Sequence, residues 1–197
     1  MDMGTGGVIY MVGPSGVGKD SLLNWLRQRV QQMAQRPPLH FAQRTITRSH
    51  ESSNEEHEAV DGDAFARLHA QGVFALQWDA HGLRYGVRHT QLVQAGAWVL
   101  VNGSRAYAEQ ARALVPGLVV LHVSAPQAAL RARLSSRGRE DAGQMQARML
   151  RASTASLEVR DGDLHLVNAG SLDESALALC AMLQARTGLQ LLTDSLA

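Results

Sequence analysis

The stretch GPSGVGKDS, from Gly13 to Ser21, has the residue types and spacing of a loop that binds phosphate. It matches the pattern G-x-x-x-x-G-K-S/T at Gly13, Gly18 and Lys19, and in this pattern backbone N–H groups and the lysine ammonium surround nucleotide phosphates. The apolar run 8–12 before it predicts a buried strand, and the leucine stripe after it predicts a helix whose N-terminus attracts anions. We therefore expect the whole loop to bind the phosphates of a nucleotide: Gly13, Pro14, Ser15, Gly16, Val17, Gly18, Lys19, Asp20 and Ser21.

Asp20 is the one departure, because the pattern places a hydroxyl residue that ligates Mg²⁺ directly after the lysine. The Asp20 carboxylate could ligate the metal itself, and the Ser21 hydroxyl could do so from the next position. Alternatively, Asp20 only complements the positive end of the helix dipole. We favour the metal role.

The composition of the basic residues supports the prediction of a phosphate-binding loop. Of the 19 basic residues, Lys19 is the only lysine and the other 18 are arginines. Codon bias explains an excess of arginine, but it does not explain where the one lysine stands. A compact ammonium follows the tight backbone curve to the phosphates better than the rigid guanidinium fork of arginine does.

The rest of the chain predicts the elements that hold this loop. Helical patterns at 21–35, 104–114, 126–136, 144–158 and 171–186 separate short apolar runs at 8–12, 39–41, 98–101, 118–123 and 164–167. This alternation is typical of an α/β fold with a parallel five-stranded sheet flanked by helices. Two strand-like halves around His81-Gly82, within 73–87, predict a small antiparallel flap above the strand ends, where such folds bind ligands. The aperiodic polar stretch 49–58 predicts an exposed loop.

Bulk properties exclude several function classes. We expect the 197 residues to form one domain, since that length is enough to bury a core. No apolar run approaches the roughly 20 residues of a membrane span, and no signal peptide is recognised, so we expect a cytoplasmic protein. The net charge of +1 gives no electrostatic case for nucleic acid. Cys180 stands in a helical apolar pattern and is expected to be buried, while His57, His81 and His89 lack metal-ligand spacing.

With the phosphate loop, four further motifs in the right order resemble the guanylate kinase family from Gly7 to about Leu183. RTITR (44–48) is similar to its S-x-T-T-R substrate element, LRYGV (83–87) to its Y-Y-G-T flap, and LVNAGSLDESA (166–176) to its V-x-N-x-D-L adenine-side ending. RLSSRG (133–138), with a further arginine at 148, is similar to its arginine lid. The resemblance implies a P-loop nucleoside monophosphate kinase-like fold with an acceptor-binding part at about 44–90 and a helical lid at about 133–150. It also implies a catalytic set and an adenine-side residue: Lys19, Arg133, Arg137 and Arg148, and Asn168.

The residues that read guanine in this family are poorly kept. Glu51 stands at the position of a phosphate-binding arginine, Asn54 at that of a base-reading acid and Val87 at that of the flap threonine. The nearby Glu55 and Glu56 could be shifted equivalents of that acid, which would require an insertion. The family's acidic D-x-D strand end is here the run 102–105, NGSR. A site that hydrogen-bonds a base rejects analogues that leave its polar groups unpaired, so losing those groups indicates a different substrate.

These departures, together with GKDS, GLRYG, VLVNGSRAY and ARLSSRGRE, resemble one branch, the ribose 1,5-bisphosphate phosphokinases of phosphonate degradation. Members of this branch transfer the γ-phosphoryl group of ATP to the 1-phosphate of ribose 1,5-bisphosphate and release 5-phosphoribosyl 1-diphosphate. The resemblance implies ATP, ribose 1,5-bisphosphate and Mg²⁺ as the partners of this chain. It also implies that an acid after the lysine is a feature of the branch.

An acceptor with two phosphates requires several cationic, bidentate donors but no general base, because a phosphate oxygen is already ionised at pH 7. We expect these donors at strand ends and in the flap: Arg44, Arg48, Arg84, Tyr85 and Arg105. Arg84 and Arg105 are the candidates for the distal phosphate, and a solvated surface role is the alternative for them and for Arg44. Two rival functions stay open, a guanylate or other nucleoside monophosphate kinase and an inactive guanylate kinase-like interaction domain. Lys19 and the lid arginines argue against the second, and the oligomeric state is not predicted.

Overall fold

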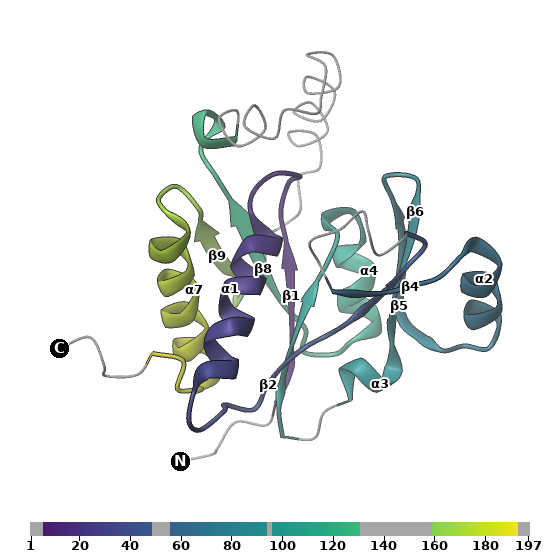
Figure 1. Cartoon of the computed structure of the whole chain (residues 1–197), viewed down its shortest axis with the longest axis horizontal. Coiled ribbons are helices and arrows are strands. Elements are labelled where there is room, and N and C mark those ends of the chain that lie inside the picture. Colours follow the sequence, from purple (N-terminus) through teal and green to yellow (C-terminus); the bar gives the residue numbers. More distant parts are fainter. Residues whose placement is uncertain (1–5, 49–55, 94–95, 131–158, 193–197) are drawn as a thin grey trace.

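Residues 6–48, 56–93, 96–130 and 159–192 are described by the computed structural model of the chain (Figure 1). Within these ranges the core is a five-stranded parallel sheet with the order β2-β7-β1-β8-β9. Its strands are β1 (Val8–Val12), β2 (Leu39–Phe41), β7 (Trp98–Asn102), β8 (Val119–Ser124) and β9 (Leu164–Val167). The predicted parallel five-stranded sheet is thus confirmed. Three of its strands have the expected bounds, and β7 and β8 differ from them by one residue at one or both ends.

Helices cover both faces of this sheet. On one face lie α1 (Lys19–Gln32) and α7 (Leu172–Thr187), whose apolar side chains join Ile9, Met11 and Leu121 in one buried cluster. On the other face lie a 3₁₀ turn, η2 (Arg105–Tyr107), and α4 (Ala108–Leu114). The predicted helix 144–158 and most of 126–136 fall outside the described residues. No helix in the described part of the chain is long and apolar enough to cross a membrane.

The C-terminal helix α7 shows how local sequence sets its ends. A capping box between Ser171 and Glu174 begins it, and Gly188, with φ 72°, ends it in the left-handed conformation that favours glycine. Cys180 is fully buried on this helix, as predicted, and burial raises the pKa of its thiol to about 11. A thiol that is not ionised at neutral pH is a packing residue rather than a nucleophile.

A second sheet of four strands, with the order β4-β3-β6-β5, forms the flap beside the core sheet (Figure 1). Its strands are β3 (Arg44–Ile46), β4 (His57–Ala59), β5 (Phe74–Ala80) and β6 (Leu83–Arg88). β5 and β6 form the predicted antiparallel hairpin, which turns at His81 and Gly82, both at positive φ. Two short helices, α2 (Gly62–Ala70) and α3 (His89–Leu92), complete the flap and were not predicted.

The last two residues of the predicted loop 49–58 belong to a strand instead. His57 and Glu58 belong to β4, which pairs in parallel with β3. The His57 side chain is 1% exposed, and its Nε2 lies 3.2 Å from the carbonyl oxygen of Arg48. A three-residue strand that begins with two polar residues gives no apolar run for a periodicity argument to detect.

The flap is joined to the core by a shared apolar cluster. Its members come from both sheets, with Tyr10, Val12 and Val101 from the core strands and Ile46, Trp78, Tyr85 and Val87 from the flap. One face of the flap therefore packs over the core, and we call it the inner face. Alternation along the strands places Arg44, Ile46, Tyr85 and Val87 on the inner face, and Thr45, Arg84 and Gly86 on the outer face.

At the far edge of the core sheet, β8 and β9 are tied to α4 by a buried acid. The Asp163 carboxylate is 2% exposed and lies 2.7 Å from Arg112 Nη2 and 3.1 Å from His122 Nε2. It also accepts a hydrogen bond from the Arg160 backbone N–H. Burial alone would raise the pKa of Asp163, but these hydrogen bonds outweigh it and hold the pKa at about 2.

Candidate active site

The predicted phosphate loop lies between the end of β1 and the start of α1. Gly16 and Gly18 have φ values of 80° and 95°, which other residues rarely adopt. At Gly13 a Cβ atom would lie 2.4 Å from the Val123 carbonyl oxygen, so only glycine fits beside β8. The Lys19 ammonium donates a hydrogen bond of 2.9 Å to the Gly13 carbonyl oxygen, which places it over the loop. The strand, loop and helix on which the phosphate-binding interpretation depends are therefore all present.

Asn168 holds this loop in place from the other side. Its Nδ2 donates a 2.7 Å hydrogen bond to the carbonyl oxygen of Val17, and its backbone N–H donates one of 2.7 Å to the carbonyl oxygen of Ser124. Asn168 is 3% exposed and Val17 is fully buried. The side-chain donor of this predicted adenine-side residue thus faces the phosphate loop.

Asp20 and Ser21 are both exposed in the first turn of α1. Asp20 Oδ1 accepts a 2.9 Å hydrogen bond from Asn102 Nδ2, and no contact to Oδ2 occurs among the described residues. These oxygens suit Mg²⁺, which binds through one or two protein oxygens together with substrate phosphates. In the described part of the chain, no three His, Cys, Asp or Glu side chains gather as a metal site, and a Mg²⁺ ion carried by ATP requires no such group.

Asn102 was noted in the sequence only as part of the replaced acidic strand end and was given no role, although it ends β7 beside the end of β1. Its side chain contacts Asp20, and its carbonyl oxygen accepts a 3.1 Å hydrogen bond from Arg44 Nη1. Asn102 is 5% exposed and Arg44 is 8% exposed. The signal that could have found it is its position at the carboxyl end of a parallel strand, where these folds place functional residues.

The acceptor candidates Arg44, Arg48 and Tyr85 lie together on the inner face of the flap. Arg48 Nη2 donates a 3.3 Å hydrogen bond to the Tyr85 hydroxyl, and the Arg44 guanidinium carbon lies 5.0 Å from the centre of the Tyr85 ring. The Trp78 ring is parallel to the Tyr85 ring, with their centres 5.5 Å apart. Because the hydroxyl oxygen accepts from Arg48, its own proton is left to donate to a ligand.

Arg84 lies apart from this group. It is the neighbour of Tyr85 on β6, and successive side chains on a strand point to opposite faces. Its Cα partner is Asp79, and both residues line a hollow of about 280 Å³ beside α2 on the outer face of the flap. This placement favours the solvated surface role that is the alternative for Arg84, and its role at the acceptor stays a prediction.

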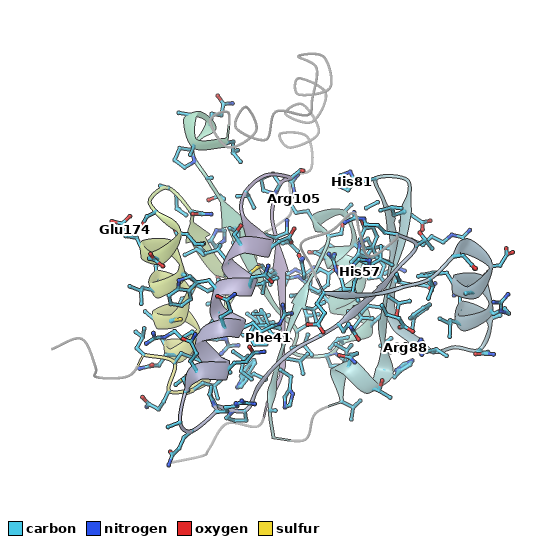
Figure 2. The ribbon with its side chains drawn as sticks, viewed as in Figure 1. Phe41, His57, His81, Arg88, Arg105 and Glu174 are labelled. Atoms are coloured by element: carbon cyan, nitrogen blue, oxygen red, sulfur yellow. The ribbon has the colours of Figure 1, made fainter. Side chains whose placement is uncertain are left out.

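Arg105 lies in the turn after β7, at the same end of the core sheet as the phosphate loop (Figure 2). It is partly buried, and this burial lowers the pKa of its guanidinium. The lid candidates Arg133, Arg137 and Arg148 lie outside the described residues, as do Glu51 and Asn54. The structure thus gathers the phosphate loop, Asp20, Asn102, Arg44, Arg48 and Tyr85 where the core sheet meets the flap.

The outer face of the flap carries its own ion pair. Arg88 donates two hydrogen bonds to the Glu58 carboxylate, at 2.6 and 2.9 Å, and Thr45 donates a third at 2.6 Å. The bond from Arg88 is the main reason why the pKa of Glu58 is lowered. These contacts join β3, β4 and β6, so they hold the strand that bears Arg44 in register with the strand that bears Tyr85.

The chain has relatives of known name, although no protein-family model matches it. The chain is 41% identical over 182 residues to a ribose 1,5-bisphosphate phosphokinase of Janthinobacterium sp., a match that covers 91% of this chain and 39% of that longer protein. It is 39% identical over 178 residues to the ribose 1,5-bisphosphate phosphokinase of Desulfomicrobium baculatum, covering 89% of this chain and 93% of that protein. Among solved structures, guanylate kinase from Anaplasma phagocytophilum matches with a TM-score of 0.68 and 19% identity, over 93% of this chain and 87% of that one. The last match establishes the guanylate kinase-like fold.

Proposed function

The chain belongs to the family of ribose 1,5-bisphosphate phosphokinases, and we propose that it transfers the γ-phosphoryl group of ATP to the 1-phosphate of ribose 1,5-bisphosphate. The products are 5-phosphoribosyl 1-diphosphate and ADP, and the reaction is a step of phosphonate degradation. ATP as the donor is consistent with a cytoplasmic location.

The polarity of the inner face of the flap is the observation that supports this acceptor best. Ile46, Leu76 and Val87 are fully buried there, and Trp78 is 8% exposed. A nucleobase is recognised by hydrogen bonds to its edge, and these side chains offer none beyond the indole N–H. The inner face instead presents two guanidinium groups and one phenol, which suit phosphate. Its described residues therefore favour a phosphorylated sugar over a nucleoside monophosphate.

The transfer itself needs charge neutralisation and alignment. The attacking atom is an oxygen of the acceptor phosphate, which is ionised at neutral pH, so no residue has to remove a proton. Lys19 and the N-terminus of α1 neutralise the donor phosphates, while Arg48 and the Tyr85 hydroxyl hold the acceptor phosphate. Arg105 is our candidate for the phosphate at the far end of the ribose.

Asp20 and Ser21 would hold the Mg²⁺ ion that accompanies ATP, and this ion would neutralise charge on the phosphates. The lid arginines Arg133, Arg137 and Arg148 would close over the donor, which excludes water and suppresses hydrolysis. Asn168 supports the loop on the adenine side through Val17.

ADP release from ATP with a panel of acceptors tests the function. We expect turnover with ribose 1,5-bisphosphate and none with ribose 5-phosphate, which lacks the accepting phosphate, or with GMP and AMP. Efficient phosphorylation of GMP, with no use of the bisphosphate, would establish the rival nucleoside monophosphate kinase, which the fold alone also permits. No turnover with any acceptor would favour an inactive interaction domain.

A further inference from the structure

Two positions at which this chain departs from the guanylate kinase pattern are in direct contact. Asp20 stands where the pattern has a hydroxyl residue, and Asn102 stands at the strand end where it has an acid. The two are separated by 82 positions, yet Asn102 Nδ2 donates a 2.9 Å hydrogen bond to Asp20 Oδ1. The sequence alone does not link these two departures. In the structure they are in contact, so each accounts for the residue type at the other position.

The contact allows one carboxylate only. An acid at position 102 would place its oxygen where the amide N–H now points, within hydrogen-bond distance of the Asp20 carboxylate. Two carboxylates at that distance repel each other or must share a proton. With a hydroxyl residue at position 20, in contrast, an acid at 102 would accept a hydrogen bond. The single carboxylate of the pair can therefore belong to the residue at the end of the strand or to the residue at the start of the helix. In this chain it belongs to Asp20, on helix α1.

The pair also connects the donor and acceptor sides of the site. The side-chain amide of Asn102 reaches the phosphate-loop helix, whereas its carbonyl oxygen receives Arg44 from the flap. Arg44 in turn lies over the Tyr85 ring, which bears the hydroxyl bonded to Arg48. A buried residue with contacts to both halves fixes the distance between them.

We propose that Asp20 and Asn102 are a compensating pair, in which Asn102 is the positioning residue that orients the Asp20 carboxylate beside the nucleotide phosphates. Relative to the guanylate kinase pattern, the acid stands at position 20 on the helix instead of position 102 on the strand. The pair of residues therefore keeps a single negative charge. The inference rests on the proposed function for the identity of the nucleotide site, but not for the identity of the acceptor.

A double-mutant cycle tests the pair: wild type, Asp20→Ser, Asn102→Asp and the double variant. The affinity for ADP in excess Mg²⁺, measured by titration calorimetry, is the primary measurement. In the presence of Asp20, Asn102→Asp should weaken ADP binding by about 10- to 100-fold, because contacting groups couple by that order. When Asp20→Ser is already present, the same substitution should cost less than about threefold, and the double variant should bind better than Asn102→Asp alone.

The matched control is Gln28→Asp, which adds the same charge two helical turns after Asp20 at an exposed position of α1. Its effect on ADP affinity should be below about threefold and should be the same with or without the Asp20→Ser substitution. Because the Arg44 contact uses the main chain of Asn102, Asn102→Asp should leave the KM for the acceptor within about twofold. A general distortion of the site would raise that KM as well.

Additive effects of Asp20→Ser and Asn102→Asp on ADP affinity, in variants whose unfolding midpoints match that of wild type, would overturn the proposal. The same holds if Gln28→Asp shows equal coupling to position 20. ADP binding requires no acceptor, so these results are separate from the acceptor panel. A chain that binds ADP with the expected coupling but ignores ribose 1,5-bisphosphate would retain the pair and refute the proposed function.

Discussion

Substitution of Asn168 separates two roles at the nucleotide site. The family resemblance places this residue on the adenine side, while the structure turns its amide donor to the carbonyl oxygen of Val17 at 2.7 Å. If it anchors the loop, its loss weakens every nucleotide equally, because the loop contacts only phosphates. If it reads the base, its loss changes the preference for adenine.

The size of the effect follows from burial. Asn168 is 3% exposed and Val17 is fully buried, so Asn168→Ala removes a hydrogen bond that is shielded from water. Removing one partner of a buried hydrogen bond costs about 1–3 kcal/mol. If the loop changes its conformation to replace the lost hydrogen bond, ATP affinity should fall by about 5- to 150-fold, because 1.4 kcal/mol corresponds to a factor of ten. Asn168→Asp should be worse than alanine, because it sets a carboxylate against the carbonyl oxygen.

The assay is equilibrium binding of ATP and GTP to wild type and both variants, with Gln28→Ala at an exposed position of α1 as a control expected within about twofold of wild type. The anchor role predicts that ATP and GTP affinities fall by the same factor, with the order wild type, alanine, aspartate. A loss confined to ATP would refute the anchor reasoning and assign Asn168 to the base. An Asn168→Asp variant that binds as well as Asn168→Ala would refute the assigned hydrogen bond.

Four further outcomes are expected. Lys19→Ala should abolish transfer with the unfolding midpoint unchanged, and turnover within tenfold of wild type would contradict the phosphate loop. Asp20→Asn should raise the Mg²⁺ concentration needed for half-maximal activity, because an amide is a poorer ligand for a hard cation than a carboxylate, and an unchanged midpoint would leave the helix-dipole role. Arg105→Ala should lower kcat/KM for ribose 1,5-bisphosphate by about 10- to 150-fold with basal ATP hydrolysis retained, while Arg84→Ala, on the outer face, should change it less than threefold. Asp163 has its pKa lowered from 3.8 to about 2, so Asp163→Asn should cost about 2 kcal/mol of unfolding free energy at pH 7. Denaturant titrations should show this difference in unfolding free energy shrinking as the pH falls from 4 to 2. The ionised carboxylate stabilises the fold fully above its ordinary pKa of 3.8, and this contribution is lost as the pH falls through the folded-state pKa of about 2.

The features predicted correctly from the sequence are those encoded by neighbouring residues. The phosphate loop is a local pattern of glycines and a lysine, and the core strands are apolar runs between turn signals. The hairpin turn at His81-Gly82 was recognisable in the same way. Each depends on interactions within about 15 residues, which a single sequence records.

The features that were missed lack such a local signal or depend on distant partners. Strand β3 is three residues long and begins with an arginine, and helix α2 buries only Phe65. The partners of Asn102 and Asn168 lie 82 and 151 positions away. Nothing in the spacing of one sequence specifies those pairs.

Arg84 is a different case, because the predicted strand itself bears on its role. Arg84 and Tyr85 are adjacent on a segment predicted to be a strand, and adjacent strand residues point to opposite faces. The period of two therefore favours the solvated surface role of Arg84 over the distal phosphate, and this choice could have been made from the sequence.

The proposed change of substrate would involve the packing beneath the base-reading positions as well as those positions themselves. A Cβ at Gly103 would lie 2.2 Å from the Tyr10 ring, and the Tyr10 hydroxyl accepts a 3.0 Å hydrogen bond from the Ser104 N–H. The Tyr10 ring meets Trp78 edge to face at 6.2 Å, and Trp78 stacks on Tyr85. The strand end that lost its acids is thus shaped by the same aromatic rings that support the acceptor tyrosine. Restoring acids at the strand end would add charge, but Ile46, Leu76 and Val87 of the inner face would still offer no hydrogen bond to a base. We therefore expect those substitutions alone to create no base-binding site.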